Sequence, residues 1–220
     1  NLRNKRPSQI IAAEIGQLTR LEVLSLAGNA LSGLVPMQLG DLDQTLRRLI
    51  LGNNMFESQL PPELGRLKML EELDISFNWL SSTIPPDFGN MISLTSLSLQ
   101  SNYRDVDGYI TWGIKDKLPT EIGNLRNIQQ LNLSSNYLTG TLIPQIGELH
   151  HLKSLHLDNN YLQGPIPSQY SSCVALREIL LHDNNIDGGS FGMPEEICGL
   201  PELEVAQVEC QVSCSCCLGC

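Results

Sequence analysis

Two histidines and two aspartates in the C-terminal half have side chains suited to metal binding or acid–base chemistry. His156 precedes Asp158, and His182 precedes Asp183; histidine nitrogens and carboxylate oxygens are common metal ligands. The same residues also stand where the surrounding pattern requires polar side chains on a surface. Nothing in the sequence resembles a nucleophile with its base and orienting partner. We therefore expect no metal, no cofactor and no enzymatic activity.

Cysteine is the second residue type that could take part in chemistry, and the chain has 7 cysteines. Cys173 stands where leucine occurs 24 residues earlier, so we expect a buried, free thiol that packs like leucine. The others gather near the C-terminus, five of them within 11 residues, and we expect disulfides to fasten that end. A thiolate metal site or lipidation of the tail is the alternative. The predicted disulfide cysteines are Cys198, Cys210, Cys214, Cys216, Cys217 and Cys220, and the alternative metal set is Cys214, Cys216, Cys217 and Cys220.

An internal repeat with a period of 24 residues positions all of these side chains. Its template is LxxLxxLxLxxNxLxxxIPxxIGx, and its cleanest copy spans 67–85. Successive third apolar positions are separated by 25, 24, 24, 34, 24 and 24 residues, so one repeat carries an insertion of 10 residues. These positions are Leu24, Leu49, Leu73, Leu97, Leu131, Leu155 and Ile179, and the asparagines in register are Asn29, Asn54, Asn78, Asn102, Asn136, Asn160 and Asn184.

The template predicts how each repeat folds and why it needs its neighbours. The alternating LxL triplet predicts a short strand with one buried face, and stacked repeats would bring these strands into one parallel sheet. The asparagine after each strand is expected to satisfy backbone groups at an inward turn. The glycine near the end of each copy is expected to allow a turn into the next. A single repeat cannot bury its own apolar face, so stability must come from stacking.

The period and the xIPxxIGxLxxL segment resemble the plant-type leucine-rich repeats of receptor-like proteins and polygalacturonase inhibitors. The resemblance covers roughly residues 10–205. It implies an α/β solenoid, a curved right-handed superhelix with a parallel concave β-sheet, built from about seven full repeats and a degenerate C-terminal one. The CxCCxxC ending over residues 196–220 is similar to that of diatom and algal leucine-rich repeat proteins.

The same pattern divides the chain into three parts. Residues 1–17 are expected to be a partial repeat or a truncated N-terminal cap, since they lack the cysteine pair usual in plant-type caps. Residues 18–199 should form seven repeats, with the insertion at about 103–117. Residues 200–220 should form a degenerate repeat and a cysteine-rich cap.

Candidate binding residues lie on the predicted concave face and in the insertion. Side chains that point outward from a rigid sheet are pre-organised for recognition, and exposed aromatic residues on a loop are typical interface anchors. Asn132 begins the one N-glycosylation sequon, Asn-Leu-Ser. The candidates on the face are Asp74, Gln100, His156, Asp158 and His182, and those in the insertion are Tyr103, Tyr109 and Trp112.

Charge and hydropathy narrow the possible partners. The formal net charge is −10, of which −8 falls within residues 154–220, and an acidic chain is unsuited to general nucleic-acid binding. No apolar run is long enough to span a membrane. Abundant cysteine and the family resemblance imply an extracellular or cell-surface location. The expected function is recognition of another protein or a glycan by a receptor-like ectodomain; the alternatives are an inhibitor of a secreted glycan-degrading enzyme and a structural or adhesion subunit.

Overall fold

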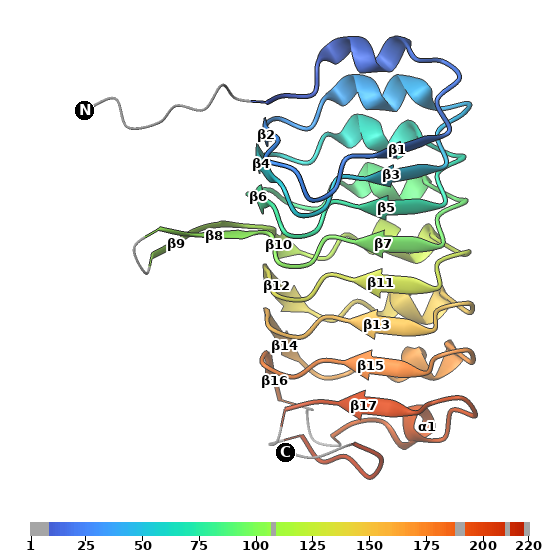
Figure 1. The fold of residues 1–220 in the computed structure, drawn as a ribbon. Helices are drawn as coiled ribbons and strands as arrows, with labels where there is room; N and C mark the ends of the chain where they lie inside the picture. The colour runs from blue at the N-terminus through green and yellow to red at the C-terminus, as the bar shows by residue number, and fades with distance from the viewer. Residues whose placement is uncertain (1–8, 107–108, 188–191, 210–211, 218–220) are drawn as a thin grey trace.

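The protein is an elongated solenoid in which one parallel sheet runs along the whole length (Figure 1). The computed structural model describes residues 9–106, 109–187, 192–209 and 212–217, and for residues 104–106 and 109–112 it describes the backbone. Eight short strands form the sheet in chain order, as the repeat count predicts. They are β1 (Val23–Ser25), β3 (Arg48–Ile50), β5 (Glu72–Asp74), β7 (Ser96–Ser98), β11 (Gln130–Asn132), β13 (Ser154–His156), β15 (Glu178–Leu180) and β17 (Val205–Gln207).

Short helices cover the side of the core opposite the sheet (Figure 1). Proline stands at the cap or first position of most of them, where its fixed φ suits a helix start and its missing N–H costs nothing. The 3₁₀ helices are η1 (Ala13–Gln17), η2 (Met37–Leu42), η3 (Pro62–Arg66), η4 (Pro86–Asn90), η5 (Thr120–Asn124), η6 (Pro144–Glu148) and η7 (Ser168–Ser172), and the last repeat has α1 (Glu195–Cys198). Within the described chain, no helix combines the length and apolar character needed to cross a bilayer.

Two smaller parallel sheets lie along the flank where each chain turn leaves the main sheet. Each of their strands follows one of the asparagines in register, called the ladder asparagines below, so the strands repeat with the same period. One sheet holds β2 (Ser32–Gly33), β4 (Met55–Ser58) and β6 (Trp79–Leu80). The other holds β10 (Lys115–Lys117), β12 (Tyr137–Thr141), β14 (Tyr161–Gly164) and β16 (Asn185–Ile186).

The register of the main sheet places the third apolar position of each repeat beside the same position in the next. Leu24 pairs with Leu49, Leu49 with Leu73 and Leu73 with Leu97. From the second repeat onward these side chains are almost fully buried, so the many leucines fill one continuous, thin core rather than separate centres.

The glycine near the end of five of the repeats has a different role from the turn that was expected. None of the five has a positive φ, so turn formation does not require glycine there. A Cβ on Gly65 would instead stand 2.6 Å from the carbonyl carbon of Asp87 in the next repeat, where nothing can move aside. Close stacking of neighbouring 3₁₀ helices is therefore what excludes larger residues. The same crowding occurs at Gly40, Gly89, Gly123 and Gly147.

The asparagine ladder works as predicted. Asn78 donates from Nδ2 to the carbonyls of Leu51, Ile75 and Ser76, and its Oδ1 accepts the N–H of Phe56 at 2.9 Å. One buried side chain thus satisfies backbone groups of two adjacent repeats, which would otherwise be buried without partners.

The insertion is a projecting hairpin rather than a plain loop (Figure 1). Strands β8 (Tyr103–Val106) and β9 (Tyr109–Gly113) pair antiparallel, with an irregularity after Arg104. Ile114 then returns to the core, 1% exposed, and β10 joins the flank sheet beside β12. The 10 extra residues therefore leave and re-enter the repeat without disturbing the core.

The two ends of the solenoid differ in how they are finished. At the N-terminal end, η1 packs on η2, and Ile10, Leu18 and Val23 remain exposed. At the C-terminal end, disulfides join Cys198 to Cys216 and Cys214 to Cys217. The first joins the tail to α1, and the second closes a short loop within the tail. The predicted disulfide residues Cys210 and Cys220 lie outside the described residues.

Cys173 is buried and free, as its leucine-like position predicts. Its thiol donates to the carbonyl of Ile146 at 3.2 Å. Burial raises the pKa of this thiol to about 11, which keeps it protonated and unreactive at neutral pH.

Tyr170 is fully buried beside Cys173, yet its hydroxyl has no hydrogen-bond partner among the described residues. Burial, and secondarily the nearby Cys173, raise the pKa of this phenol well above its usual value. The equivalent residue in an earlier repeat, Phe88, fills the same kind of core position without a polar atom.

We expect Tyr170→Phe to raise the free energy of unfolding by about 1 kcal/mol, because it removes a buried polar group that is unsatisfied. Urea unfolding followed by circular dichroism would measure the gain. Tyr161→Phe, at an exposed tyrosine, is the control and should change stability by less than about 0.5 kcal/mol. A destabilised Tyr170→Phe protein would show that the hydroxyl has a partner.

Candidate partner-binding surface

The concave face carries a network of hydrogen bonds that fixes its polar side chains. Asp74 Oδ1 accepts from the backbone N–H of Ser76 at 2.8 Å and from its hydroxyl at 2.5 Å. Two repeats further on, Asn132 Nδ2 donates to Gln100 Oε1 at 2.6 Å. Asp74 and Gln100, both predicted binding residues, are therefore held by neighbours and lose little freedom when a partner docks.

His156 belongs to a second group on this face, formed across β13 and β15. Its Nε2 lies 2.8 Å from Glu178 Oε2 and 2.9 Å from the hydroxyl of Ser154. The polar partner of His156 is thus a carboxylate on the adjacent strand. His182 lies one repeat on, with its Nε2 3.8 Å from Asp183 Oδ2.

Two predicted binding residues keep a buried polar atom without a partner among the described residues. They are Asp158, through Oδ1, and His182, through Nδ1, which occupy equivalent positions in successive repeats. An unpaired buried acceptor or donor is costly, so a hydrogen bond supplied to either atom would be favourable.

Ion pairs between successive repeats give the N-terminal part of the sheet a different character. Arg47 pairs with Glu71 at 2.7 Å, and Arg48 pairs with Glu72 at 2.6 Å. Exposed pairs of this kind contribute little to stability. They do set alternating charge along the edge of the face, which favours a partner with complementary charges.

The hairpin projects beside this face, and its base is tightly packed. Tyr103, predicted as a binding residue, is 44% exposed. Gly113, at the other end of the hairpin, lies against the Tyr137 ring, since a Cβ there would be 2.6 Å from Tyr137 Cε2. Tyr109 and Trp112 were also predicted to bind, and their side chains lie outside the described part of the structure.

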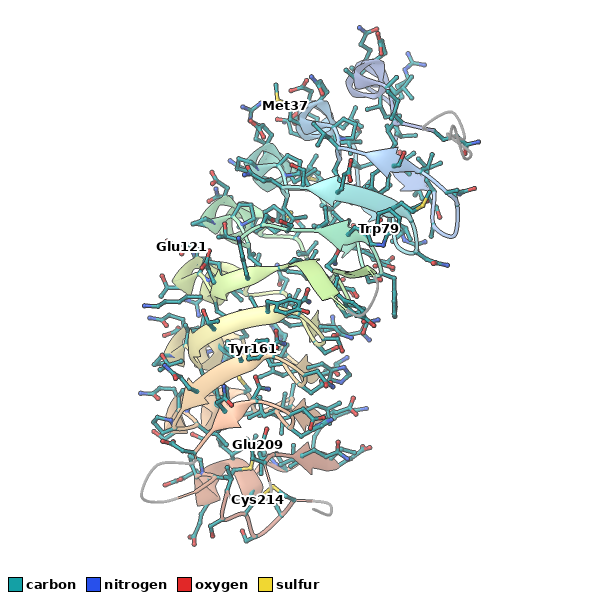
Figure 2. All side chains as sticks on the ribbon, turned by 90° about the vertical axis from the view of Figure 1, so that its left-hand side faces the viewer. Met37, Trp79, Glu121, Tyr161, Glu209 and Cys214 are labelled. Atoms are coloured by element: carbon teal, nitrogen blue, oxygen red, sulfur yellow. A yellow bond between two sulfur atoms is a disulfide. The ribbon has the colours of Figure 1, made fainter. Side chains whose placement is uncertain are left out.

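A groove of about 370 Å³ begins at the hairpin base. Most of the residues that line it were not among the binding residues predicted from the sequence. Aromatic residues follow the ladder asparagine in four successive repeats, and three of these line the groove. Reading that column of the repeat would have revealed them. The column is Trp79, Tyr103, Tyr137 and Tyr161, and the groove is lined by Tyr103, Ser135, Asn136, Tyr137, Asn159, Asn160, Tyr161 and Asp183. Trp79 and Tyr161 mark this flank in Figure 2.

The predicted glycosylation site lies in the middle of the concave face. Asn132 is half-buried on β11, and its Oδ1 accepts from the N–H of Ser134 at 3.1 Å and from its hydroxyl at 2.8 Å. A glycan on Nδ2 would displace the bond to Gln100. Modification of Asn132 remains a prediction.

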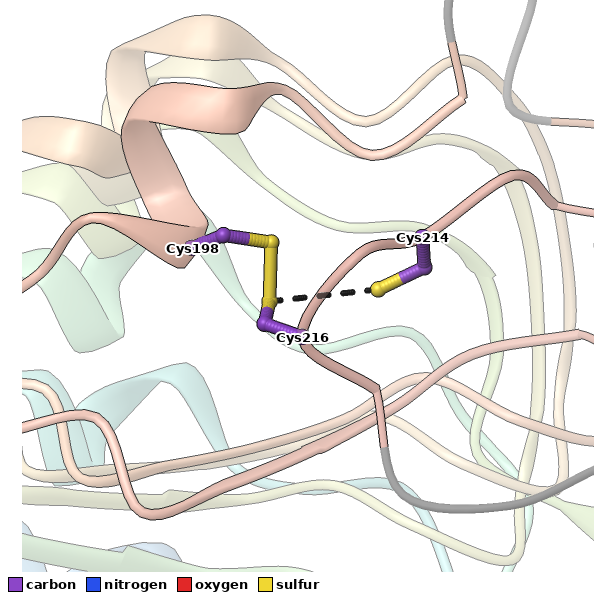
Figure 3. A group of neighbouring side chains, drawn as sticks. All are labelled: Cys198, Cys214 and Cys216. Atoms are coloured by element: carbon purple, nitrogen blue, oxygen red, sulfur yellow. Dashed lines mark hydrogen bonds between the residues drawn. A yellow bond between two sulfur atoms is a disulfide. The ribbon is translucent and has the colours of Figure 1, made fainter.

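The sulfur atoms of Cys198, Cys214 and Cys216 form the one described group with the spacing of potential metal ligands (Figure 3). Cys198 and Cys216 are joined in a disulfide, and Cys214 is joined to Cys217. A sulfur in a disulfide is not a thiolate ligand. The oxidised pairs therefore match the expected fastening of the tail rather than the alternative metal set.

Comparison with known proteins identifies the family. The profile described as Leucine Rich Repeat matches residues 20–42, 45–67, 69–91, 127–149 and 151–173, together more than half of the chain. The chain belongs to the leucine-rich repeat family. The gap between the third and fourth matched segments contains the hairpin.

The relatives of this leucine-rich repeat chain include plant receptors. It is 34% identical over 61 residues to the LRR receptor-like serine/threonine-protein kinase EFR of Arabidopsis thaliana, covering 28% of this chain and 6% of that protein. The fold matches the plant peptide hormone receptor RGFR1, solved with RGF2, with a TM-score of 0.83 and 32% identity over 92% of this chain and 30% of that one.

A second solved receptor gives the same picture. The Arabidopsis receptor kinase HAESA, solved with the peptide hormone IDA and the co-receptor SERK1, has a TM-score of 0.68 and 28% identity, covering 92% of this chain and 40% of that one. The chain thus spans less than half of the length of these relatives. The plant-type, receptor-like resemblance inferred from the repeat is confirmed.

Proposed function

We propose that the chain is a ligand-binding ectodomain region of a receptor-like protein at the cell surface or outside the cell, and that it recognises a peptide or protein through its concave face. The observation that carries the proposal is the set of hydrogen bonds, within one repeat for Asp74 and between neighbouring repeats for Gln100 and His156, that fixes these side chains on a rigid sheet. Pre-organised polar side chains of this kind bind with little loss of entropy. The chain acts by recognition rather than by catalysis.

Similarity to peptide-hormone receptors supports this choice of partner. RGFR1 and HAESA, which share the fold over most of this chain, were solved with peptide hormones. The proposal extends to this chain the class of ligand, not the identity of either hormone. The unpaired atoms of Asp158 and His182 are the places where a peptide would add hydrogen bonds that the free protein lacks.

A displayed library of random 15-residue peptides tests the proposal. Peptides selected on the intact chain should lose at least tenfold in affinity for the variant His156→Ala/His182→Ala, which removes side chains from two adjacent repeats. The matched control is Glu63→Ala, a half-buried acidic residue on η3 of the opposite face, which should leave affinity unchanged.

Isothermal titration of the selected peptides gives the affinities. Failure to select any peptide, or equal loss with the Glu63→Ala control, would overturn the concave face as the recognition surface. Thermal unfolding of each variant checks that the fold is retained.

A further inference from the structure

The flank groove contains a stacked pair of aromatic rings with one end open. Tyr137 and Tyr161 lie with ring centroids 5.7 Å apart and planes 26° from parallel. In the next repeat the same column holds Asn185, which is exposed, so the stack ends at Tyr161. Tyr161 is 52% exposed. A flat apolar surface is thus presented beside the groove.

This aromatic surface is rigid, because the hairpin holds it in place. The Tyr137 ring is packed between the Gly113 backbone on one side and Tyr161 on the other. Tyr103 begins the first strand of the hairpin opposite Gly113 and forms one end of the groove. A platform that is already fixed loses little entropy when a ligand stacks on it.

A row of polar side chains borders the aromatic rings. Ser135, Asn159 and Asp183 occupy the same position in three successive repeats, immediately before the ladder asparagine. All three have left-handed backbone conformations, with φ of 54°, 53° and 55°. The shared conformation sets their hydroxyl, amide and carboxylate groups at one repeat spacing along the groove.

The groove also contains a buried acceptor that lacks a donor. Elsewhere in the ladder, asparagine Oδ1 accepts the backbone N–H two residues beyond the preceding ladder asparagine, as Asn160 does from Leu138 at 3.0 Å. For Asn136, the backbone N–H in the equivalent place belongs to the hairpin. The Oδ1 of Asn136 therefore has no partner among the described residues, and the residue is only 4% exposed. Such an atom calls for a hydroxyl or amide donor from a ligand.

These features together fit one kind of ligand. A sugar ring has an apolar face of C–H groups that stacks on tyrosine and a rim of hydroxyls that bond to amide, hydroxyl and carboxylate groups. No lining residue is cationic, and Asp183 is acidic, so an anionic sugar would be repelled. A peptide is less suited, because β12 and β14 beside the groove are each paired with a neighbouring strand on both sides and offer no free backbone edge.

The geometry points to a carbohydrate site: the groove binds a neutral oligosaccharide, with one pyranose ring stacked on Tyr161 and hydroxyls bonded to Asp183, Asn159 and Asn136. The volume, about 370 Å³, is at the small end of ligand sites and suits a short segment of a glycan. This site lies on the flank next to the concave face and does not depend on a peptide partner there.

Isothermal titration with a panel of hexasaccharides tests the site. The panel holds neutral glucan, xylan and mannan hexamers, with oligogalacturonate as the anionic comparison. We expect at least one neutral hexamer to bind the intact chain and oligogalacturonate to bind at least tenfold more weakly. Tyr161→Ala should weaken the neutral hexamer at least tenfold, whereas Tyr161→Phe should retain affinity within threefold, since the stacking ring remains.

Phe77→Ala is the matched control, because Phe77 is 51% exposed and lies outside the groove-lining residues. It should bind the hexamer as the unaltered chain does, and so should the concave-face variant His156→Ala, whose side chain contacts Ser154 and Glu178 and none of the groove-lining residues. If all variants unfold at the same temperature, loss of the fold is excluded as the cause of a change in affinity.

Three outcomes would overturn the carbohydrate site. They are no binding of any neutral hexamer at millimolar concentration, binding that Tyr161→Ala leaves unchanged, and peptides from the displayed library that require Tyr161 while no hexamer binds. The concave-face proposal has its own tests: it fails if no peptide is selected, or if peptide binding does not depend on His156 and His182. The two proposals can therefore be rejected separately.

Discussion

Replacing Gly65 with alanine should destabilise the protein by about 3 kcal/mol, the upper part of the usual cost of overpacking. A Cβ at this position would lie 2.6 Å from the carbonyl carbon of Asp87 and 2.8 Å from its Cβ. Both atoms belong to the next repeat, in which η4 is stacked on η3. Relief of the clash would require two repeats to separate, and that would open the core between them.

Gly199→Ala provides the control for this substitution. A Cβ at Gly199 would have its nearest neighbours at 3.6 Å, an ordinary contact, so the change should stay within about 0.5 kcal/mol. Urea unfolding monitored by circular dichroism measures both proteins. If Gly65→Ala were as stable as Gly199→Ala, the tight stacking of the 3₁₀ helices would not be a requirement of the fold.

The fold could be predicted from the sequence because repetition supplies the evidence many times over. Each LxL triplet alone is a weak signal for a strand, but seven copies at one period leave a single way to bury the leucines. The register of Leu49 beside Leu73 follows directly from that period. The role of the glycine column did not follow, because crowding between repeats is a property of the stack and not of one turn.

The candidate site was less predictable, since it depends on contacts between repeats. The binding residues on the concave face were named from their column, but the pairing of His156 with Glu178 required knowledge of which side chains meet across two strands. The groove depends on the stacking of Tyr137 on Tyr161 across two repeats, a contact that the pattern within one repeat does not indicate. The insertion was visible as 10 extra residues, whereas its hairpin geometry depends on pairing of two strands with little alternation.

The hairpin also shows how an irregular repeat creates a candidate site. Its return to the core at Ile114 preserves the apolar stack. The changes it causes fall on the flank, where Gly113 fixes Tyr137 and where Asn136 has an acceptor without a partner. A regular solenoid would have neither feature. The departure from the repeat is therefore what sets this flank apart.

Replacing Asn78 with alanine should cost about 3 kcal/mol, comparable with the loss at Gly65, because several buried backbone groups lose their partner together. The Nδ2 bonds to Leu51, Ile75 and Ser76 at 3.0 to 3.2 Å would disappear, as would the bond from the N–H of Phe56. Asn78 is 1% exposed, so water cannot easily replace these contacts.

Asn29→Ala tests whether burial, and not the residue type, produces this effect. Asn29 begins the same ladder, and its Nδ2 donates to Leu26 at 2.9 Å and Ala27 at 3.3 Å. It is exposed, so water can take over those bonds, and the expected cost is below about 1 kcal/mol. Hydrogen exchange at the amide of Phe56 should accelerate in Asn78→Ala alone. Equal unfolding midpoints for the two variants would mean that the ladder does not stabilise the interior of the solenoid, and the stacked leucines would then have to carry that stability by themselves.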